Sequence, residues 1–116
     1  MAIPHAKSGD LIDVRPLGAS LRKTISTTLV SADDVEVFRL VLPAGEQIPD
    51  HKMPRTCELP GVVTIQCLEG EVEINSHGRT QALRMGHMVY LASGEPHALK
   101  AIKDSSVLVT TLVQRS

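Results

Sequence analysis

The sequence has very few aromatic residues. Among its 116 residues, Phe38 and Tyr90 are the only aromatic side chains, and tryptophan is absent. Proteins that bind single-stranded nucleic acid stack the bases on aromatic side chains, which this chain largely lacks. An excess of charge is missing too, because 12 Lys and Arg are balanced by 13 Asp and Glu, for a formal net charge of −1. Without a basic field to attract phosphates, we expect no nucleic-acid partner.

Long hydrophobic runs are also absent. No segment approaches the roughly 18 apolar residues that cross a bilayer, and the first ten residues, MAIPHAKSGD, lack the apolar core of a signal peptide. We therefore expect a soluble, cytoplasmic protein with no membrane partner. Cysteine is scarce as well: Cys57 and Cys67 are the only two, and they form no CxxC motif. In a reducing compartment we expect no disulfide framework, and the spacing does not favour a cysteine-only zinc site.

The sequence does contain a series of short β-branched runs separated by Gly, Pro, Asn, Asp and Ser. Val72 and Ile74 alternate with Glu71 and Glu73, which is the period of a strand with one buried face. No window shows the apolar spacing of a helix. The pattern therefore favours an all-β sandwich or barrel, and we expect two hairpins among its strands. The expected strands are 24–30, 35–42, 62–68, 71–75, 79–83, 87–92, 97–101 and 106–113.

The length fits one domain with a single core. We predict a domain spanning residues 1–116, with its core at about 24–113. Residues 1–10 carry few apolar groups, and we expect them to be poorly ordered or to pair across a dimer.

The five histidines differ in their surroundings. His5 lies in the expected tail, His77 in a tight turn and His87 at the start of a strand, so we interpret all three as solvated side chains. His51 and His97 each border a strand near a turn, and imidazole is a frequent ligand for zinc, iron, manganese or nickel. The alternative is that each hydrogen-bonds in a partly buried pocket. Two histidines alone fall short of the three protein ligands of a typical catalytic site.

The stretch 35–112 resembles the cupin superfamily, whose second motif is G-x5-P-x-G-x2-H-x3-N. Gly86, Gly94 and His97 match that motif, while Ala92 replaces its proline and Ala101 its asparagine.

The first cupin motif, G-x5-H-x-H-x3-4-E-x6-G, fits at its ends. Gly45 and His51 match the start, and Gly70 matches the end. Between them Met53 replaces the second histidine, and some six residues around MPRTCEL are inserted. Pro60-Gly61 before VVTIQCLEG resembles a subgroup of small single-domain cupins of the conserved-barrel type, in which an apolar residue replaces the usual glutamate.

The resemblance implies an antiparallel double-stranded β-helix, the jelly-roll cupin barrel, holding one divalent metal such as Fe, Mn, Zn or Ni. His51 and His97 match the family's ligands. A third ligand would come from the inserted loop, with Glu58 the first candidate and Cys57 the next; a solvated loop carboxylate is the alternative for Glu58. Two histidines and one carboxylate are an arrangement that suits non-haem iron and oxygen chemistry.

The barrel interior implied by the resemblance is aliphatic. Val63, Ile65, Cys67 and Leu99 would line it, with Met53 packed over the pocket as an apolar lid and Cys57 beside it. Cys67 is interpreted as a small apolar filler. Such a pocket suits a small apolar or mixed ligand better than a sugar.

Two functional classes follow from this resemblance. The first is a metal-dependent oxidoreductase of the dioxygenase type, or an isomerase. The second is a non-enzymatic module that binds or senses a small molecule and has an incomplete metal site; a dimerising scaffold is a third possibility. The sequence assigns no catalytic residue. Because a small antiparallel barrel leaves exposed strand edges, we also predict a homodimer.

Overall fold

The computed structural model describes residues 5–48, 61–76, 78–92 and 97–113. This part of the chain contains nine strands and one short 3-10 helix, and that helix is neither long nor apolar enough to cross a membrane. In chain order the elements are η1 (Gly18–Lys23), β1 (Thr27–Ser31), β2 (Val35–Leu42), β3 (Gln47–Ile48), β4 (Gly61–Glu69), β5 (Glu71–Ser76), β6 (Arg79–Arg84), β7 (Met88–Leu91), β8 (Ala98–Ala101) and β9 (Ser105–Val113).

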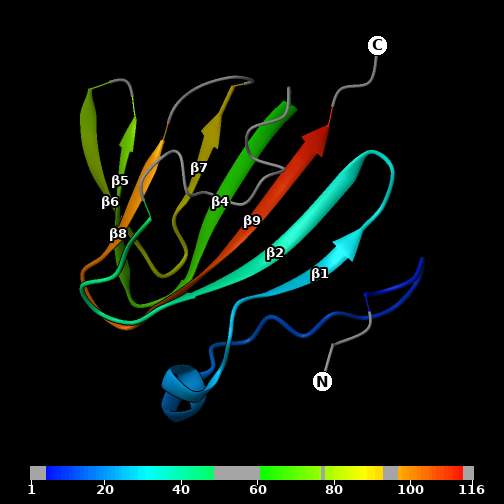
Figure 1. Ribbon diagram of the computed structural model, residues 1–116, viewed down its shortest axis with the longest axis horizontal. Coiled ribbons are helices and arrows are strands. Elements are labelled where there is room, and N and C mark those ends of the chain that lie inside the picture. The colour runs from blue at the N-terminus through cyan, green and yellow to red at the C-terminus, as the bar shows by residue number, and fades with distance from the viewer. Residues whose placement is uncertain (1–4, 49–60, 77, 93–96, 114–116) are drawn as a thin grey trace.

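The strands form two sheets, and every strand pair in them is antiparallel. Sheet A has the order β1-β2-β9-β4-β7, and sheet B has the order β3-β8-β5-β6. Figure 1 shows β5, β6 and β8 standing beside the fan of sheet A. The two expected hairpins are present as β1–β2 and β5–β6. The predicted all-β jelly-roll barrel is thus confirmed.

The core lies between the two sheets. Alternate residues of each strand face inward, as the pleat of a strand requires. Val72 and Ile74 on β5 are fully buried, as their alternation with glutamates predicted. The remaining members of this cluster come from β2, β4, β6, β7, β8 and β9. They are Leu40, Leu42, Val63, Ile65, Cys67, Leu83, Leu91, Leu99, Ala101, Val107 and Val109.

The turn that carries the chain from sheet A to sheet B depends on Gly70. This residue has a φ of +83°, a conformation that side chains with a Cβ rarely adopt. A Cβ at this position would lie 2.3 Å from the backbone oxygen of Asp104. The close approach between the β4–β5 and β8–β9 turns therefore requires glycine.

An N-terminal arm, residues 5–26, packs against sheet A. Its Ala6 N–H donates to the Leu29 carbonyl of β1 at 2.8 Å. The arm ends in η1, which buries Leu21, before β1 begins. Figure 1 shows the arm running past β1 with η1 at the lower end of the sheet. Residues 5–10 of the expected tail therefore have a contact within their own chain.

Candidate functional site

His97 lies just before β8 and is 3 % exposed. It has the same parity as Leu99 and Ala101, which are both buried, so these three residues share the inner side of β8. β8 lies between β3 and β5 in sheet B. The imidazole is thus a buried polar group at one end of the interior.

The surroundings of this end of β8 are aliphatic. Leu99 is the register partner of Ile48 on β3 and of Ile74 on β5. Ile74 and Leu99 belong to the buried core, and Ile48 packs against it. A ligand that reached His97 from the interior would therefore meet hydrocarbon on the neighbouring strands.

The sequence-predicted lining residues Val63, Ile65, Cys67 and Leu99 all lie in the buried core. The Cys67 thiol is directed toward two carbonyl oxygens, that of Glu69 at 3.4 Å and that of Gly70 at 3.7 Å. Burial raises the pKa of the Cys67 thiol, so it stays protonated at neutral pH. A protonated thiol inside the core acts as an apolar filler and is a poor metal ligand.

His51, Met53, Cys57 and Glu58 lie outside the described residues, so the predicted metal set stays a prediction. Within the residues that the structure does describe, no group of three or more His, Cys, Asp or Glu side chains is placed to hold a metal ion. His87 is exposed, and its Nδ1 accepts a hydrogen bond from the Arg84 N–H at 3.0 Å.

A second polar cluster lies under the N-terminal arm, and the sequence interpretation missed it. Arg39, Glu69 and Ser106 are buried together on the outer side of sheet A. Ser106 donates its hydroxyl to Glu69 Oε2 at 2.6 Å, and Arg39 Nη2 lies 3.7 Å from the same oxygen. We call these three residues the arm anchor.

The arm anchor binds backbone groups of the arm. The Glu69 carboxylate accepts the N–H of Leu17 at 2.8 Å and that of Gly18 at 3.0 Å. Arg39 donates to the carbonyls of Val14 and Arg15. Backbone donors thus meet the carboxylate and backbone acceptors meet the guanidinium. Among the described residues, the Arg39 Nε is buried without a hydrogen-bond partner, so the guanidinium is only partly satisfied. The contacts of Glu69 and of Arg39 Nη2 hold the arm against sheet A.

The electrostatics of Glu69 reflect these contacts. Burial by itself would raise the pKa of the carboxyl, but the hydrogen bonds from Leu17, Ser106 and Gly18 lower it below its usual value. The positive charge of Arg39 acts in the same direction. Glu69 is therefore ionised at neutral pH. One signal in the sequence could have pointed to this cluster, an arginine within the apolar strand VEVFRLVL.

Comparisons with known proteins give different answers for sequence and for structure. No family model matches the sequence, and no curated protein matches it significantly. An RmlC-like cupin from Desulfovibrio desulfuricans superposes with a TM-score of 0.67 at 23 % identity, covering 93 % of this chain and 97 % of its own. A cupin superfamily protein from Desulfitobacterium hafniense gives a TM-score of 0.72 at 20 % identity, covering 94 % and 100 % of the two chains.

A larger enzyme shares part of this structure. A point mutant of salicylate 1,2-dioxygenase from Pseudoaminobacter salicylatoxidans gives a TM-score of 0.63 at 19 % identity. The match covers 74 % of this chain and 25 % of the enzyme. At these identities the likeness concerns the fold, and it agrees with the two antiparallel sheets described above. The chain thus has the fold of the small RmlC-like cupins.

Proposed function

We propose that this protein holds a divalent metal ion through His51 and His97 and binds a small molecule beside it, at the end of the barrel where β3 and β8 meet. The observation that carries the proposal is the burial of His97 among apolar neighbours on the inner side of β8. Imidazole is the commonest nitrogen ligand for Fe, Mn, Zn and Ni.

Connectivity supports a role for His51 next to His97. The β3–β8 ladder pairs Ile48 with Leu99, and His97 precedes Leu99 by two residues. His51 follows Ile48 by three residues, and three extended residues span at most about 11 Å. We therefore propose that both histidines act at the same pair of strand ends.

The donor chemistry fits a hard or borderline ion. Cys67 stays a neutral thiol, so the described interior offers imidazole without a competing thiolate. Glu58 is the proposed third ligand, with Cys57 the alternative. A metal held by two imidazoles and a carboxylate supplies Lewis-acid or oxygen-binding chemistry, as an oxidoreductase or an isomerase would need. The likeness to a salicylate dioxygenase agrees with the oxidoreductase version.

A second candidate function is a non-enzymatic binding or sensing module. It is favoured by the aliphatic register partners of Leu99, Ile48 and Ile74, which offer no groups to orient or activate a substrate. In both versions we propose a cytoplasmic protein that forms a homodimer.

Metal content tests the first proposal most directly. The protein is purified without a histidine tag, supplemented with Fe, Mn, Zn or Ni, and its metal is quantified by mass spectrometry. We expect stoichiometric metal in the wild type and its loss in His51→Ala and His97→Gln, because each change removes a ligand. His87→Ala is the matched control, since His87 is exposed and should leave the metal content unchanged.

The result of the metal measurement distinguishes the two proposed functions. A wild type that carries no stoichiometric metal after supplementation contradicts the metal site and leaves the binding module. Circular dichroism of His97→Gln separates loss of a ligand from loss of the fold. A Glu58→Gln variant with unchanged metal affinity would remove Glu58 from the proposed shell.

A further inference from the structure

The outer face of sheet B carries a cavity that the proposed metal site does not use. It has a volume of about 260 Å³, and all four strands of the sheet contribute to its lining. Pockets for drug-sized ligands measure about 300–1,000 Å³, so this cavity suits a smaller molecule. Its lining residues are Gln47, Ile48, Glu73, Asn75, Thr80, Ala98, Leu99 and Lys100.

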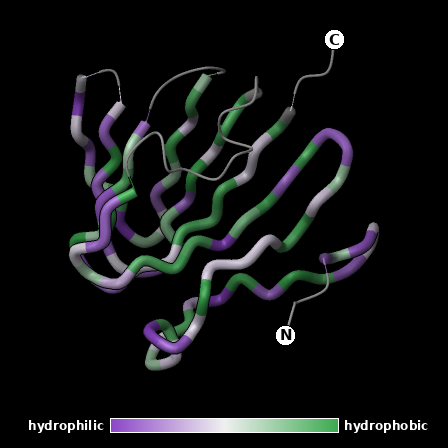
Figure 2. The backbone as a smooth tube through the Cα atoms, viewed as in Figure 1, coloured by the Kyte–Doolittle hydropathy of each residue, from purple (hydrophilic) through white to green (hydrophobic). Residues whose placement is uncertain are grey.

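The cavity lies on the opposite side of β8 from His97. Because successive side chains of a strand alternate between its two faces, Ala98 and Lys100 point outward where His97 and Leu99 point inward. Figure 2 shows hydrophilic segments on β5, β6 and β8, as expected for strands with one face in water. A ligand in this cavity would therefore be separated from the barrel interior by the sheet itself.

The two charged members of the cavity are opposite each other but do not pair. Lys100 on β8 is the register partner of Glu73 on β5, at a spacing of about 5 Å. On the same face of the sheet, Glu71 on β5 and its register partner Arg84 on β6 form an ion pair at 3.4 Å. Among the described residues, by contrast, neither Glu73 nor Lys100 takes part in an ion pair. The cavity thus offers one positive and one negative group to a ligand.

Neutral hydrogen-bonding groups lie beside these charges. Ala98, Asn75 and Thr80 form the neighbouring outward row across β8, β5 and β6. Asn75 Nδ2 donates to Thr80 Oγ1 at 3.2 Å, which leaves Asn75 Oδ1 as an acceptor and the Thr80 hydroxyl as a donor. Ala98 contributes only a methyl group, so the row is hollow between Asn75 and the edge of the sheet.

The charges indicate which class of ligand fits. A purely anionic ligand would meet the like charge of Glu73, and a purely cationic ligand would meet that of Lys100. A free α-amino acid carries an ammonium and a carboxylate on one carbon, so it can donate to Glu73 and accept from Lys100 at the same time. Asn75 and Thr80 can then bind a small polar side chain of the same amino acid.

We propose that this cavity binds a free α-amino acid with a small polar side chain, with its carboxylate on Lys100 and its ammonium on Glu73. In the free protein water hydrates both groups, and the ligand replaces that water. This site is independent of the metal site proposed above, because His97 lies on the other side of the sheet. Exposed charges bind weakly, so we expect a dissociation constant of about 1 mM.

Titration of the isotope-labelled full chain with L-serine or L-asparagine, followed by heteronuclear NMR, tests the site. EDTA is present throughout, so that the amino acid cannot bind through a metal ion. We expect saturable shifts of backbone amides that line the cavity. L-Serinamide lacks the carboxylate and N-acetyl-L-serine lacks the ammonium, so each should bind about fivefold more weakly than L-serine. D-Glucose, which is uncharged, should bind more weakly than either amino acid.

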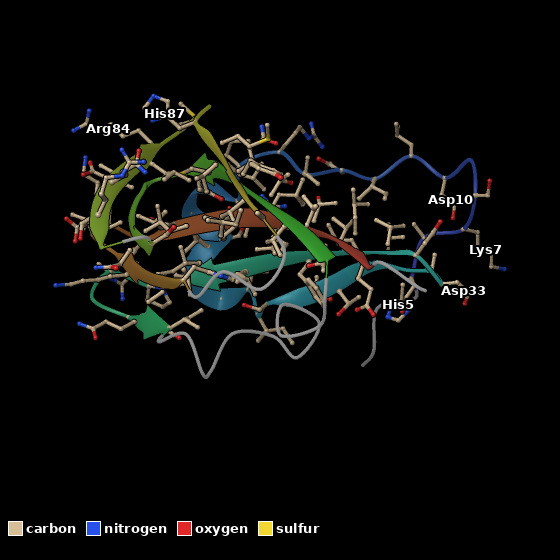
Figure 3. The ribbon with its side chains drawn as sticks, turned by 90° about the horizontal axis from the view of Figure 1, so that it is seen from above. His5, Lys7, Asp10, Asp33, Arg84 and His87 are labelled. Atoms are coloured by element: carbon tan, nitrogen blue, oxygen red, sulfur yellow. The ribbon has the colours of Figure 1, made fainter. Side chains whose placement is uncertain are left out.

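Variants of the lining residues test the contacts. Glu73→Gln and Lys100→Gln should each weaken L-serine binding about fivefold, and Ala98→Leu should abolish it by filling the hollow. Arg84→Gln is the matched control, since it removes a charge of the same face that is already paired. Figure 3 shows Arg84 beside His87 at one end of the molecule. This variant should leave the dissociation constant unchanged, and the NMR spectrum of each variant reports whether its fold is intact.

Several results would overturn this site. The absence of a saturable shift with both amino acids would exclude it, and N-acetyl-L-serine or D-glucose binding as tightly as L-serine would exclude the proposed ligand class. Binding that survives in Glu73→Gln and Lys100→Gln but is lost in His97→Gln would place the amino acid inside the barrel. The metal content of the protein is measured separately, so a failure of this site is distinguishable from a failure of the metal site.

Discussion

The outer faces of the two sheets contrast in charge. On sheet B the outward positions of β5, β6 and β8 include Glu71, Glu73, Arg84 and Lys100. On sheet A the charged residues Arg39 and Glu69 are buried beneath the arm, and the open remainder of the face is uncharged. The same antiparallel pleat thus supports one outer face that carries solvated charges and one whose charges are buried beneath the arm.

A surface cavity shows the same contrast. It has a volume of about 260 Å³ on sheet B, and polar side chains that include Gln47, Glu73, Asn75 and Thr80 line it together with Ile48, Ala98 and Leu99. Charged and amide side chains remain hydrated at such a surface without a partner. The difference between the faces shows that charge placement, rather than strand pattern, distinguishes the outer face that the arm partly covers from the outer face of sheet B.

The largest expected effect comes from removing the charge of the arm anchor. Glu69→Gln should lower the free energy of unfolding by about 3 kcal/mol, because it leaves Arg39 as a buried charge without its carboxylate. It also replaces an acceptor of the Leu17 and Gly18 N–H groups by an amide donor. Urea titration followed by circular dichroism measures the change.

Glu73→Gln is the control for this prediction. It removes the same charge from the outer side of β5 in sheet B, and it should change stability by no more than about 0.5 kcal/mol. Equal losses in the two variants would contradict the contrast between buried and solvated charges. Limited proteolysis adds a local measurement, since the arm of Glu69→Gln should be cleaved faster than that of Glu73→Gln.

Lowering the pH should reduce the difference in the free energy of unfolding between the wild type and Glu69→Gln. The pKa of Glu69 is lowered in the folded protein, whereas an unfolded glutamate titrates near about 4.3. Between these values the unfolded state binds more protons, so stability falls as pH falls. The contribution of the carboxylate is complete above the unfolded pKa and is lost as pH falls through the folded pKa. The urea midpoints of both proteins, measured from neutral pH into the acid range, report this loss of stability. A difference between the two midpoints that stays constant with pH would refute the stabilising role of the ionised Glu69 carboxylate.

The sequence predicted the fold well because local alternation encodes it. Val72 and Ile74 alternate with glutamates, so their burial follows from the period of a strand. The β1–β2 and β5–β6 hairpins join neighbours along the chain, and turn residues mark both. His97 was found through its spacing from Gly86 and Gly94, although its burial needed the structure.

The arm anchor could not be predicted in the same way. Glu69 binds Leu17 across 52 residues of sequence, a distance that no periodicity encodes. Parity along β4 also misleads, because Glu69 follows the inward residues Val63, Ile65 and Cys67. An irregularity in the register between Cys67 and Glu69 shifts the glutamate to the outer side, opposite Ser106. A bulge of this kind depends on the partner strand and leaves no mark in the local pattern.

The smallest expected effect concerns the ion pair on sheet B. Arg84 Nε lies 3.4 Å from Glu71 Oε1, and the arginine side chain is 68 % exposed. Water and salt screen such a pair, so Arg84→Gln should change the free energy of unfolding by no more than about 0.5 kcal/mol. Roughly 1 M salt should remove even that difference, because the screening length is then about 3 Å. The loss in Glu69→Gln should persist in the same salt, since the arm excludes ions from the anchor. If Arg84→Gln cost more than about 1.5 kcal/mol, sheet B would hold its charges as firmly as sheet A does, and the proposed difference between the two faces would fail.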